Sequence, residues 1–286
     1  MTNPSRQQAL VAAMPAVFVL IWSTGFIVAR YGMPHAPPMK FLALRYALSV
    51  ACFLVWAFVA RAAWPADRRQ YRHLAVVGVL MHAGYLGGVW AAVKLGMGAG
   101  LAALLVGLQP VLTAVWLSSR GGAVSRRQWT GLLLGLAGLA LVVWQKLGVG
   151  EISRANFSLA LIALLSITAG TLYQKRYLAP CDVRTANLVQ LCAAFVVTLP
   201  LALLESESVR WNGQLMGALG WSVLALTLGG SSLLYLLIQR GAATAVTSLL
   251  YLVPPTTAVM AWLLFGESIT LATVAGTALT ALGVSL

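Results

Sequence analysis

Long apolar stretches alternate with short polar connections along the whole chain. An α-helix needs about 20 apolar residues to cross the hydrocarbon core of a bilayer. The pattern therefore predicts an all-α membrane protein with ten transmembrane helices and no soluble domain. The expected spans are 11–31, 39–61, 73–94, 98–119, 127–146, 156–176, 185–204, 215–238, 242–264 and 269–286.

The ends of this pattern call for two interpretations. The first span is too long for the apolar part of a secretory signal and is followed by no A-x-A cleavage pattern, so we interpret it as a true span. The last span reaches Leu286 without a polar tail. Whether the natural chain continues past this residue is left open.

The ninth expected span, 242–264, carries Pro254 and Pro255 near its middle. A proline inside a helix removes a backbone hydrogen bond, and in lipid the freed carbonyl must find a donor in protein or water. We therefore expect this span to line a cavity, with Tyr251 facing it. Together with Pro110 of the fourth span, the two prolines are predicted gating residues.

The two halves of the chain repeat each other. A shift of 145 positions places Gly241 on Gly96, Pro255 on Pro110 and Gly276 on Gly131. The predicted repeats are residues 1–150 and 151–286, with five spans each. Because five is odd, the second repeat enters the membrane from the opposite side, and inverted repeats of this kind are typical of transporters that bind substrate near the bilayer midplane.

Composition supports a membrane protein. Hydrophobic residues make up 60% of the chain, charged residues only 9%, and the mean hydropathy is +0.87. The formal net charge of +13 comes from residues between the spans, a pattern that sets topology and contacts anionic lipid headgroups, so no nucleic-acid partner is expected. The three cysteines form no cluster with histidine, so neither a metal site nor another cofactor is indicated.

The basic residues also predict the orientation. With the N-terminus inside, the inner loops and span edges carry 12 Lys and Arg residues and the outer ones carry 7. Positive residues are enriched on the cytoplasmic side of membrane proteins. We expect both termini in the cytoplasm and a location in the bacterial inner membrane.

Several motifs occur in an order that resembles a known family. They are Pro37-Pro38 with Ala43-Leu44-Arg45-Tyr46, then Leu108-Gln109-Pro110-Val111 and Gln128-Trp129-Thr130-Gly131, and in the second half Leu252-Val253-Pro254 and Trp262 to Glu267. The chain resembles the EamA-type ten-span members of the drug/metabolite transporter superfamily. With Trp22-Ser23-Thr24-Gly25-Phe26 in the first span, it looks most like the YddG-type amino-acid exporters. An acidic residue usual after the fourth span is missing at Arg120-Gly121-Gly122, whereas its counterpart Glu267 is present.

Acidic residues are confined to the edges of spans and to loops, at Asp67, Glu151, Asp182, Glu205, Glu207 and Glu267. A proton or sodium site built on an intramembrane carboxylate is therefore not expected. Hydrolysis by paired carboxylates has no candidate residues, and no HExxH or GxSxG signature occurs, so we do not expect an enzyme.

Small polar and aromatic residues inside the spans are the candidates for substrate contact. They are Trp22, Ser23, His82, Tyr85, Trp90, Gln109, Thr168, Thr171, Ser232, Tyr235 and Tyr251. His82 is a substrate contact, a group that titrates near neutral pH and couples transport to protons, or a neutral packing residue. Arg45 either extends to the membrane interface or lies inside and meets a substrate carboxylate.

Spans five and ten contain little besides Leu, Ala, Gly and Thr, and their Gly-xxx-Gly spacing allows close helix packing. We expect these two spans to form a scaffold or a homodimer surface, and spans 1, 3, 4, 6, 8 and 9 to form the pathway. Trp56, Trp64, Trp129, Trp144, Trp211 and Trp221 lie near span ends and are expected at the membrane interface.

The sequence thus predicts an alternating-access transporter in the lipid bilayer that exports small amphiphilic metabolites. Amino acids with aromatic or large apolar side chains are the expected substrates, because rings and hydroxyl groups suit them. An exporter of other metabolites or drugs is one alternative. An intramembrane enzyme or lipid-handling protein is another, and a purely structural membrane scaffold would leave the buried prolines and mid-span polar groups unexplained.

Overall fold

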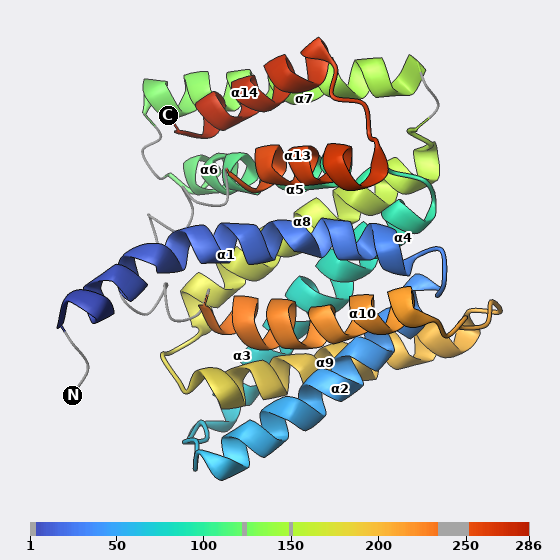
Figure 1. Cartoon of the computed structure of the whole chain (residues 1–286). Helices are drawn as coiled ribbons and strands as arrows, with labels where there is room; N and C mark the ends of the chain where they lie inside the picture. Colours follow the sequence, from blue (N-terminus) through green and yellow to red (C-terminus); the bar gives the residue numbers. More distant parts are fainter. Residues whose placement is uncertain (1–3, 122–124, 149–150, 234–251, 286) are drawn as a thin grey trace.

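The computed structural model describes residues 4–121, 125–148, 151–233 and 252–285. Within these ranges the chain forms helices and no strand (Figure 1). The first half contains α1 (Pro4–Gly32), α2 (Pro38–Val59), α3 (Arg68–Gly78), η1 (Val79–Gly84), α4 (Tyr85–Lys94), α5 (Ala99–Val106), α6 (Gln109–Ser119) and α7 (Arg126–Gly148). The second half contains α8 (Arg154–Tyr177), α9 (Val183–Leu204), α10 (Gly213–Trp221), η2 (Ser222–Ser231), α13 (Val253–Phe265) and α14 (Leu271–Ser285).

Helices long enough to cross a membrane recur along the chain. Among the described residues, five helical segments are both long and apolar enough, with bounds at Pro38–Val59, Arg68–Lys94, Ala99–Trp116, Arg154–Tyr177 and Val183–Leu204. Shorter apolar helices cover Ala16–Gly32, Trp129–Trp144 and Val253–Phe265. The chain is therefore a multi-pass membrane protein.

The helix boundaries of the two halves coincide after the shift of 145 positions. Helix α9 (183–204) falls on α2 (38–59), and the end of α8 at 177 falls on the end of α1 at 32. The starts of α10 at 213 and α14 at 271 fall on those of α3 at 68 and α7 at 126. The internal repeat seen in glycines and prolines therefore extends to the secondary structure.

The polar residues that begin two of these helices are also equivalent. Asp67 precedes α3 and its carboxylate accepts a hydrogen bond from the Arg69 N–H, whereas Asn212 precedes α10 and its side-chain oxygen accepts from the Leu215 N–H. Both side chains satisfy N–H groups that have no partner within their own helix. The shift of 145 places Asp67 on Asn212.

Two π-helical segments occupy equivalent places as well. Segment η1 spans 79–84, and the shift carries it to 224–229, inside η2 at 222–231. In η1 the N–H of Tyr85 bonds to the carbonyl of Leu80, five residues earlier, and the Tyr46 hydroxyl donates to the His82 carbonyl at 2.8 Å. π-Helical segments are rare overall, and those that occur are often found at functional sites. This pair therefore marks the third and eighth spans as candidates for a functional site.

The helices pair across the two halves. Helices α7 and α14 pack along one edge of the bundle and run in opposite directions, as do α2 and α9 at the other edge (Figure 1). A methyl group added to Gly276 of α14 would lie 2.5 Å from the carbonyl oxygen of Gly138 of α7, so these backbones approach closely. The close packing predicted from the Gly-xxx-Gly spacing of the fifth span is thus present.

The fourth span is interrupted. Helix α5 ends at Val106, Gly107 and Leu108 form a turn, and α6 begins at Gln109 with Pro110 in its first turn. Similarly, Pro254 and Pro255 lie in the first turn of α13, where proline is well tolerated because no N–H is needed there. The carbonyls of residues 250 and 251, which we expected these prolines to free, lie outside the described residues.

Candidate functional site

A cavity lies between the two halves, in the middle of the bundle. It offers ≈ 80 Å³ to the centres of water-sized molecules, which is room for several waters or part of a small solute. Its walls come from α1, α2, η1, α4, α8, α9 and η2. The lining residues are Trp22, Gly25, Phe26, Arg45, Met81, His82, Tyr85, Leu86, Val89, Trp90, Gln174, Asn187, Gln190, Leu226 and Ser231.

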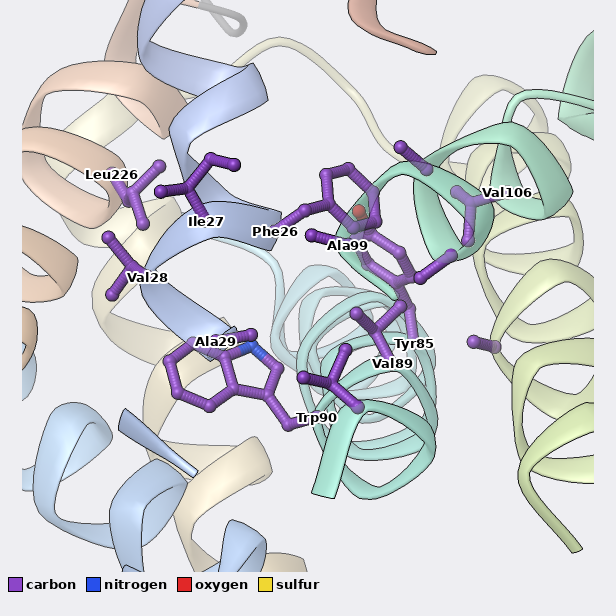
Figure 2. Close-up of a cluster of buried hydrophobic side chains, with 14 of the residues drawn as sticks. Phe26, Ile27, Val28, Ala29, Tyr85, Val89, Trp90, Ala99, Val106 and Leu226 are labelled. Carbon is purple, nitrogen blue, oxygen red and sulfur yellow. The ribbon is translucent and has the colours of Figure 1, made fainter. Parts of the chain in front are cut away.

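Aromatic side chains form one wall of the cavity. Figure 2 shows Phe26 of α1 with Tyr85 and Trp90 of α4 between these two helices. Trp90 is 1% exposed and stacks on Phe41 with the ring centroids 4.3 Å apart. Such rings offer large apolar faces, and Trp22 and Tyr85 add polar groups at their edges.

A buried arginine faces this aromatic wall. Arg45 of α2 is only 6% exposed, and its Nε donates a hydrogen bond to the Thr227 hydroxyl of η2 at 3.1 Å. The Thr227 hydroxyl in turn donates to the Ser222 carbonyl at 2.8 Å. Of the two readings of the sequence, the structure favours the inner position for Arg45.

Neutral polar groups line the remainder. Gln174 comes from α8, Asn187 and Gln190 from α9, His82 from η1 and Ser231 from η2. The Asn187 amide nitrogen donates to the Val183 carbonyl at 2.8 Å, which leaves its oxygen available as an acceptor. None of the six acidic residues, all of which are described, lines the cavity.

The cavity extends toward one end of the bundle. Gln174 lies one turn before the end of α8 at Tyr177, and Asn187 lies one turn after the start of α9 at Val183. These two helix ends lie at the end of the bundle where α1 begins (Figure 1). We call it the opposite end, because it is opposite to the end that contains Glu205, Glu207 and Glu267. Trp90 of the cavity wall and its stacking partner Phe41 lie toward the other side, where α1 finishes.

That other side, which we call the carboxylate end, contains Glu205, Glu207 and Glu267. The Glu205 carboxylate accepts hydrogen bonds from the N–H groups of Met39 and Lys40 in the first turn of α2, at 2.9 and 2.8 Å. Glu267 accepts from the N–H groups of Ala99 and Gly100 in the first turn of α5, at 2.9 and 3.3 Å. Helix N-termini carry partial positive charge, so both carboxylates stabilise the helices that they cap.

Glu207 adds an ion pair at the same end. Its carboxylate lies 2.6 Å from Lys94 Nζ at the end of α4, and Lys94 also donates to the Met33 carbonyl at 3.1 Å. The Lys94 ammonium holds the pKa of Glu207 below its usual range. Each of these three glutamates comes from the second half and contacts the first half.

The residues predicted from the sequence fall into distinct places. Trp22, His82, Tyr85 and Trp90 lie on the cavity wall. Ser23 donates to the Val19 carbonyl inside its own helix at 2.7 Å. Ser232 follows the lining residue Ser231, and its buried hydroxyl has no hydrogen-bond partner in the described part of the chain. Tyr235 and Tyr251 lie outside the described residues.

The remaining candidates lie beside the interrupted fourth span. The Gln109 amide donates to the Thr171 hydroxyl at 2.8 Å, while Thr168 donates to the Leu164 carbonyl within α8. Pro254 packs against Gly107, because a methyl group added there would meet Pro254 Cγ at 2.8 Å. No described residue of spans four and nine lines the cavity, whereas spans two and seven, which the sequence analysis left out, contribute to it.

A signal for Arg45 was present in the sequence. Leu42 and Ser49, three residues before and four after it, are both buried, so all three share one helix face. The shift of 145 places Arg45 on Gln190, which lies on the cavity wall from the equivalent helix. Two polar residues at equivalent places in apolar spans point inward together.

A multi-pass helical bundle with an internal repeat and a central cavity walled by both repeats defines a membrane transporter. The model of the EamA-like transporter family matches residues 10–144 and again residues 156–286. The chain belongs to this family, which is part of the drug/metabolite transporter superfamily. It is a transporter and not an enzyme, as expected from the sequence.

Relatives and a solved structure agree with this assignment. The chain is 25% identical over 203 residues to the "Probable amino-acid metabolite efflux pump" of Salmonella typhimurium, a match that covers 70% of this chain and 64% of that relative. It is 26% identical over 269 residues to the "Uncharacterized inner membrane transporter YedA" of Escherichia coli (strain K12), covering 92% and 86%. A crystal structure with 17% sequence identity covers 95% of both chains with a TM-score of 0.68, which shows the fold.

Proposed function

We propose that the chain is an alternating-access exporter of small amphiphilic metabolites in the bacterial inner membrane. The observation that carries this proposal is the central cavity, whose walls combine aromatic rings with amide, hydroxyl and guanidinium groups from both repeats. Amino acids with aromatic or large apolar side chains are the proposed substrates. The Salmonella relative, named a "Probable amino-acid metabolite efflux pump", supports this class.

The architecture that we propose is ten spans in two inverted repeats, residues 1–150 and 151–286. Support comes from the coinciding helix boundaries and from the opposite directions of α2 and α9 and of α7 and α14 (Figure 1). Contacts between spans support it too: α4 packs on α8 as η2 packs on α1, and α5 packs on α8 as α13 packs on α1. These contact pairs exchange under the repeat, and superposition of the halves after a rotation of about 180° in the membrane plane is the expected test.

The proposed orientation places both termini in the cytoplasm. The cavity then extends toward the cytoplasm, and the carboxylate end lies outside. An exporter in this state is ready to take substrate from the cell. The test of this orientation is labelling by an impermeant thiol reagent in intact and in permeabilised cells. The reporter is Ala66→Cys, at an exposed position in the loop after α2, in a background whose three cysteines are replaced by serine.

Trp22, His82, Tyr85 and Trp90 are proposed to contact the substrate, with Ser23, Gln109, Thr168, Thr171, Ser232, Tyr235 and Tyr251 as further candidates. Because no carboxylate lines the cavity, we propose movement down the substrate gradient, or coupling to protons through His82. Replacement of His82 by Gln tests this role. An obligatory proton dependence that survives the replacement excludes His82 as the coupling group.

The central experiment reconstitutes the full chain into liposomes. Uptake of a panel of labelled amino acids is measured with and without an imposed proton gradient. We expect phenylalanine, tryptophan and leucine to be taken up faster than glycine, aspartate or lysine. If the folded protein transports none of these amino acids but transports another metabolite or a drug, the proposed function changes to export of that other class of solute.

A further inference from the structure

Arg45 is a buried positive charge without a negative partner. The guanidinium group has five N–H donors. One of them, on Nε, bonds to Thr227, and among the described residues this is its one hydrogen bond. Each of the six carboxylates lies elsewhere, three at the carboxylate end and the others at helix starts or in loops.

Such a charge is costly to bury. Buried charges in proteins are normally paired or fully hydrogen-bonded, because removal from water costs several kcal/mol per ion. The Thr227 hydroxyl fixes the Nε edge of the guanidinium, and it is itself fixed by the Ser222 carbonyl at 2.8 Å. The group is therefore held in one orientation on the cavity wall, and its Nη donors have no hydrogen-bond partner among the described residues.

The residues around Arg45 determine which kind of ligand can pair with its guanidinium group. His82, Tyr85 and Trp22 line the same cavity, and none of them is an anion at neutral pH. A planar guanidinium binds a carboxylate through two parallel hydrogen bonds, and the aromatic wall accepts an apolar or aromatic group beside it. A cationic solute, in contrast, meets a like charge and no acid.

We infer that Arg45 is the residue that recognises the carboxylate of the transported solute, and that Thr227 is its positioning residue. This inference rests on the proposed transport function and specifies its substrates: the cavity takes carboxylate-bearing solutes with an apolar or aromatic group and excludes their amide and amine analogues. The solute supplies the negative charge that the chain itself lacks. Substrate binding thereby completes the buried ion pair.

The test uses four phenyl probes on the full chain. L-Phenylalanine and phenylacetate carry the carboxylate, whereas L-phenylalaninamide and phenethylamine lack it. Transport into liposomes and thermal stabilisation in detergent are measured for each probe. We expect the wild type to move and be stabilised by the two carboxylates in preference to the two amines.

The variants separate the charge from the fold. Arg45→Gln should weaken binding of both carboxylates about ten- to hundredfold, the range for a hydrogen bond to a charged group. It should not weaken binding of the two amines, because it removes a like charge. Arg45→Lys should retain part of the preference, and Thr227→Val should reduce it without removing it. Arg30→Gln is the matched control, because Arg30 lies at the end of α1 and does not line the cavity.

Thermal unfolding gives a readout independent of transport. Arg45→Met removes the unpaired charge, so the empty variant should unfold at a higher temperature than the empty wild type. Added phenylacetate should then stabilise the wild type and not the variant. If the Arg45→Met variant does not fold, it shows no unfolding transition. The Arg45→Lys variant is then compared with the wild type instead.

The outcomes distinguish this inference from the transport function. Two results would overturn the role of Arg45. One is an equal loss of binding of the carboxylate and amine probes in Arg45→Gln, and the other is no loss of carboxylate binding compared with Arg30→Gln. Transport of phenethylamine but of no carboxylate would overturn it and leave the transport function intact. Binding of carboxylates through Arg45 without movement of any probe would instead support Arg45 and overturn the transport function.

Discussion

The carboxylate end and the opposite end of the bundle connect the two halves of the chain with different chemistry. At the carboxylate end, Glu205 and Glu267 of the second half cap helices α2 and α5 of the first, and Glu207 pairs with Lys94. At the opposite end, the described hydrogen bonds between the halves are neutral. The ion pair of Asp182 with Arg184 lies within the start of α9, and the Arg184 guanidinium lies over the Trp56 ring of α2, 6.0 Å from its centroid.

The neutral contacts of the opposite end are hydrogen bonds from amide, hydroxyl and imidazole groups. The Gln70 amide donates to the Ala179 carbonyl at 2.7 Å, and the Thr185 hydroxyl donates to the Ala63 carbonyl at 2.9 Å. His73 bonds to the Tyr173 hydroxyl at 2.9 Å. The cavity extends toward this end, whereas charge-assisted hydrogen bonds connect the halves at the carboxylate end.

Under the proposed alternating-access mechanism, this difference makes the two ends unequal in the interactions that must be broken to open them. Charge-assisted hydrogen bonds are roughly twice as strong as neutral ones. Opening the carboxylate end therefore costs more free energy per hydrogen bond broken. Closure of the opposite end around a bound solute is one source of that free energy. The following predictions test whether the carboxylates are what makes the two ends unequal.

The largest effect is expected from Glu267→Ala. Loss of the carboxylate leaves the N–H groups of Ala99 and Gly100 uncapped, and loss of a helix cap costs about 1–2 kcal/mol. We expect a lower unfolding temperature in detergent and a carboxylate end that opens more often. The opening is measured by thiol labelling of Ala36→Cys, a position that is 1% exposed, in a background whose three cysteines are replaced by serine.

The control for this prediction is Asp67→Ala. Asp67 also caps a helix, but it caps its own helix α3 and connects no two halves. It should lower stability without increasing the labelling at position 36. Equal labelling in both variants would show that cap loss, and not the connection between halves, controls opening.

The sequence predicted the helices better than the connections between them. Hydropathy located the spans, and the glycine and proline pattern located the repeat, because both signals are local or periodic. The contact of Glu205 with Met39 joins residues 166 positions apart, and no local pattern announces it. Glu267 was noticed through its missing counterpart at Gly122, which lies outside the described residues.

The candidate site shows the same limit. Trp22, His82, Tyr85 and Trp90 were selected as polar or aromatic residues far from span ends, and they lie on the cavity wall. The six tryptophans expected at the interface are all at least 40% exposed. The pathway spans were selected by their aromatic and small polar residues, and spans two and seven were left out on that basis. The packing of these two helices turns Arg45, Asn187 and Gln190 toward the cavity.

A smaller effect is expected at the opposite end. Tyr173→Phe removes the hydrogen bond to His73 but keeps the ring that packs against His73 and Tyr177. A neutral hydrogen bond contributes about 0.5–1.5 kcal/mol, so the unfolding temperature should fall less than in Glu267→Ala. Labelling of Ala36→Cys should stay as in the parent, since the carboxylate end is untouched. Increased labelling would contradict the independence of the two ends.

Acid should affect the two ends differently. The pKa of Glu207 is lowered by the hydrogen bond from Lys94, and that of Asp182 by the hydrogen bond from Arg184. A lowered pKa in the folded state means that the contribution is present above the unfolded value, about 4.3 for Glu and 3.9 for Asp, and is lost as the pH falls through the folded value. Only the Glu207 pair connects the two halves.

We therefore expect labelling of Ala36→Cys by an acid-tolerant thiol reagent to increase modestly as the pH falls below about 4. Glu207→Gln should show the raised labelling already at neutral pH and no further increase from this pair in acid. Asp182→Asn is the matched control and should leave the labelling profile unchanged. An acid response that persists in full in Glu207→Gln would show that the pair of Glu207 with Lys94 does not control opening of the carboxylate end.

The smallest effect on stability is expected from Pro254→Ala. Pro254 lies in the first turn of α13, where its missing N–H has no cost, and alanine has a high helix propensity, so the variant should fold. Its ring packs against Gly107 at the interruption between α5 and α6, where the two halves meet. Removal of the ring should leave stability within about 1 kcal/mol and slow transport, because a packing contact at a proposed gate is lost.

Gly107→Ala sharpens this last test. The added methyl group would lie 2.8 Å from Pro254 Cγ, too close for a normal contact, and overpacking of this kind costs about 1–3 kcal/mol. In Pro254→Ala the ring is absent, so the double variant should regain most of that stability, and a double-mutant cycle measures the coupling. Full coupling with unchanged transport in Pro254→Ala would make this contact structural only. Slow transport in Pro254→Ala with normal stability would instead place a moving part at the interruption between α5 and α6.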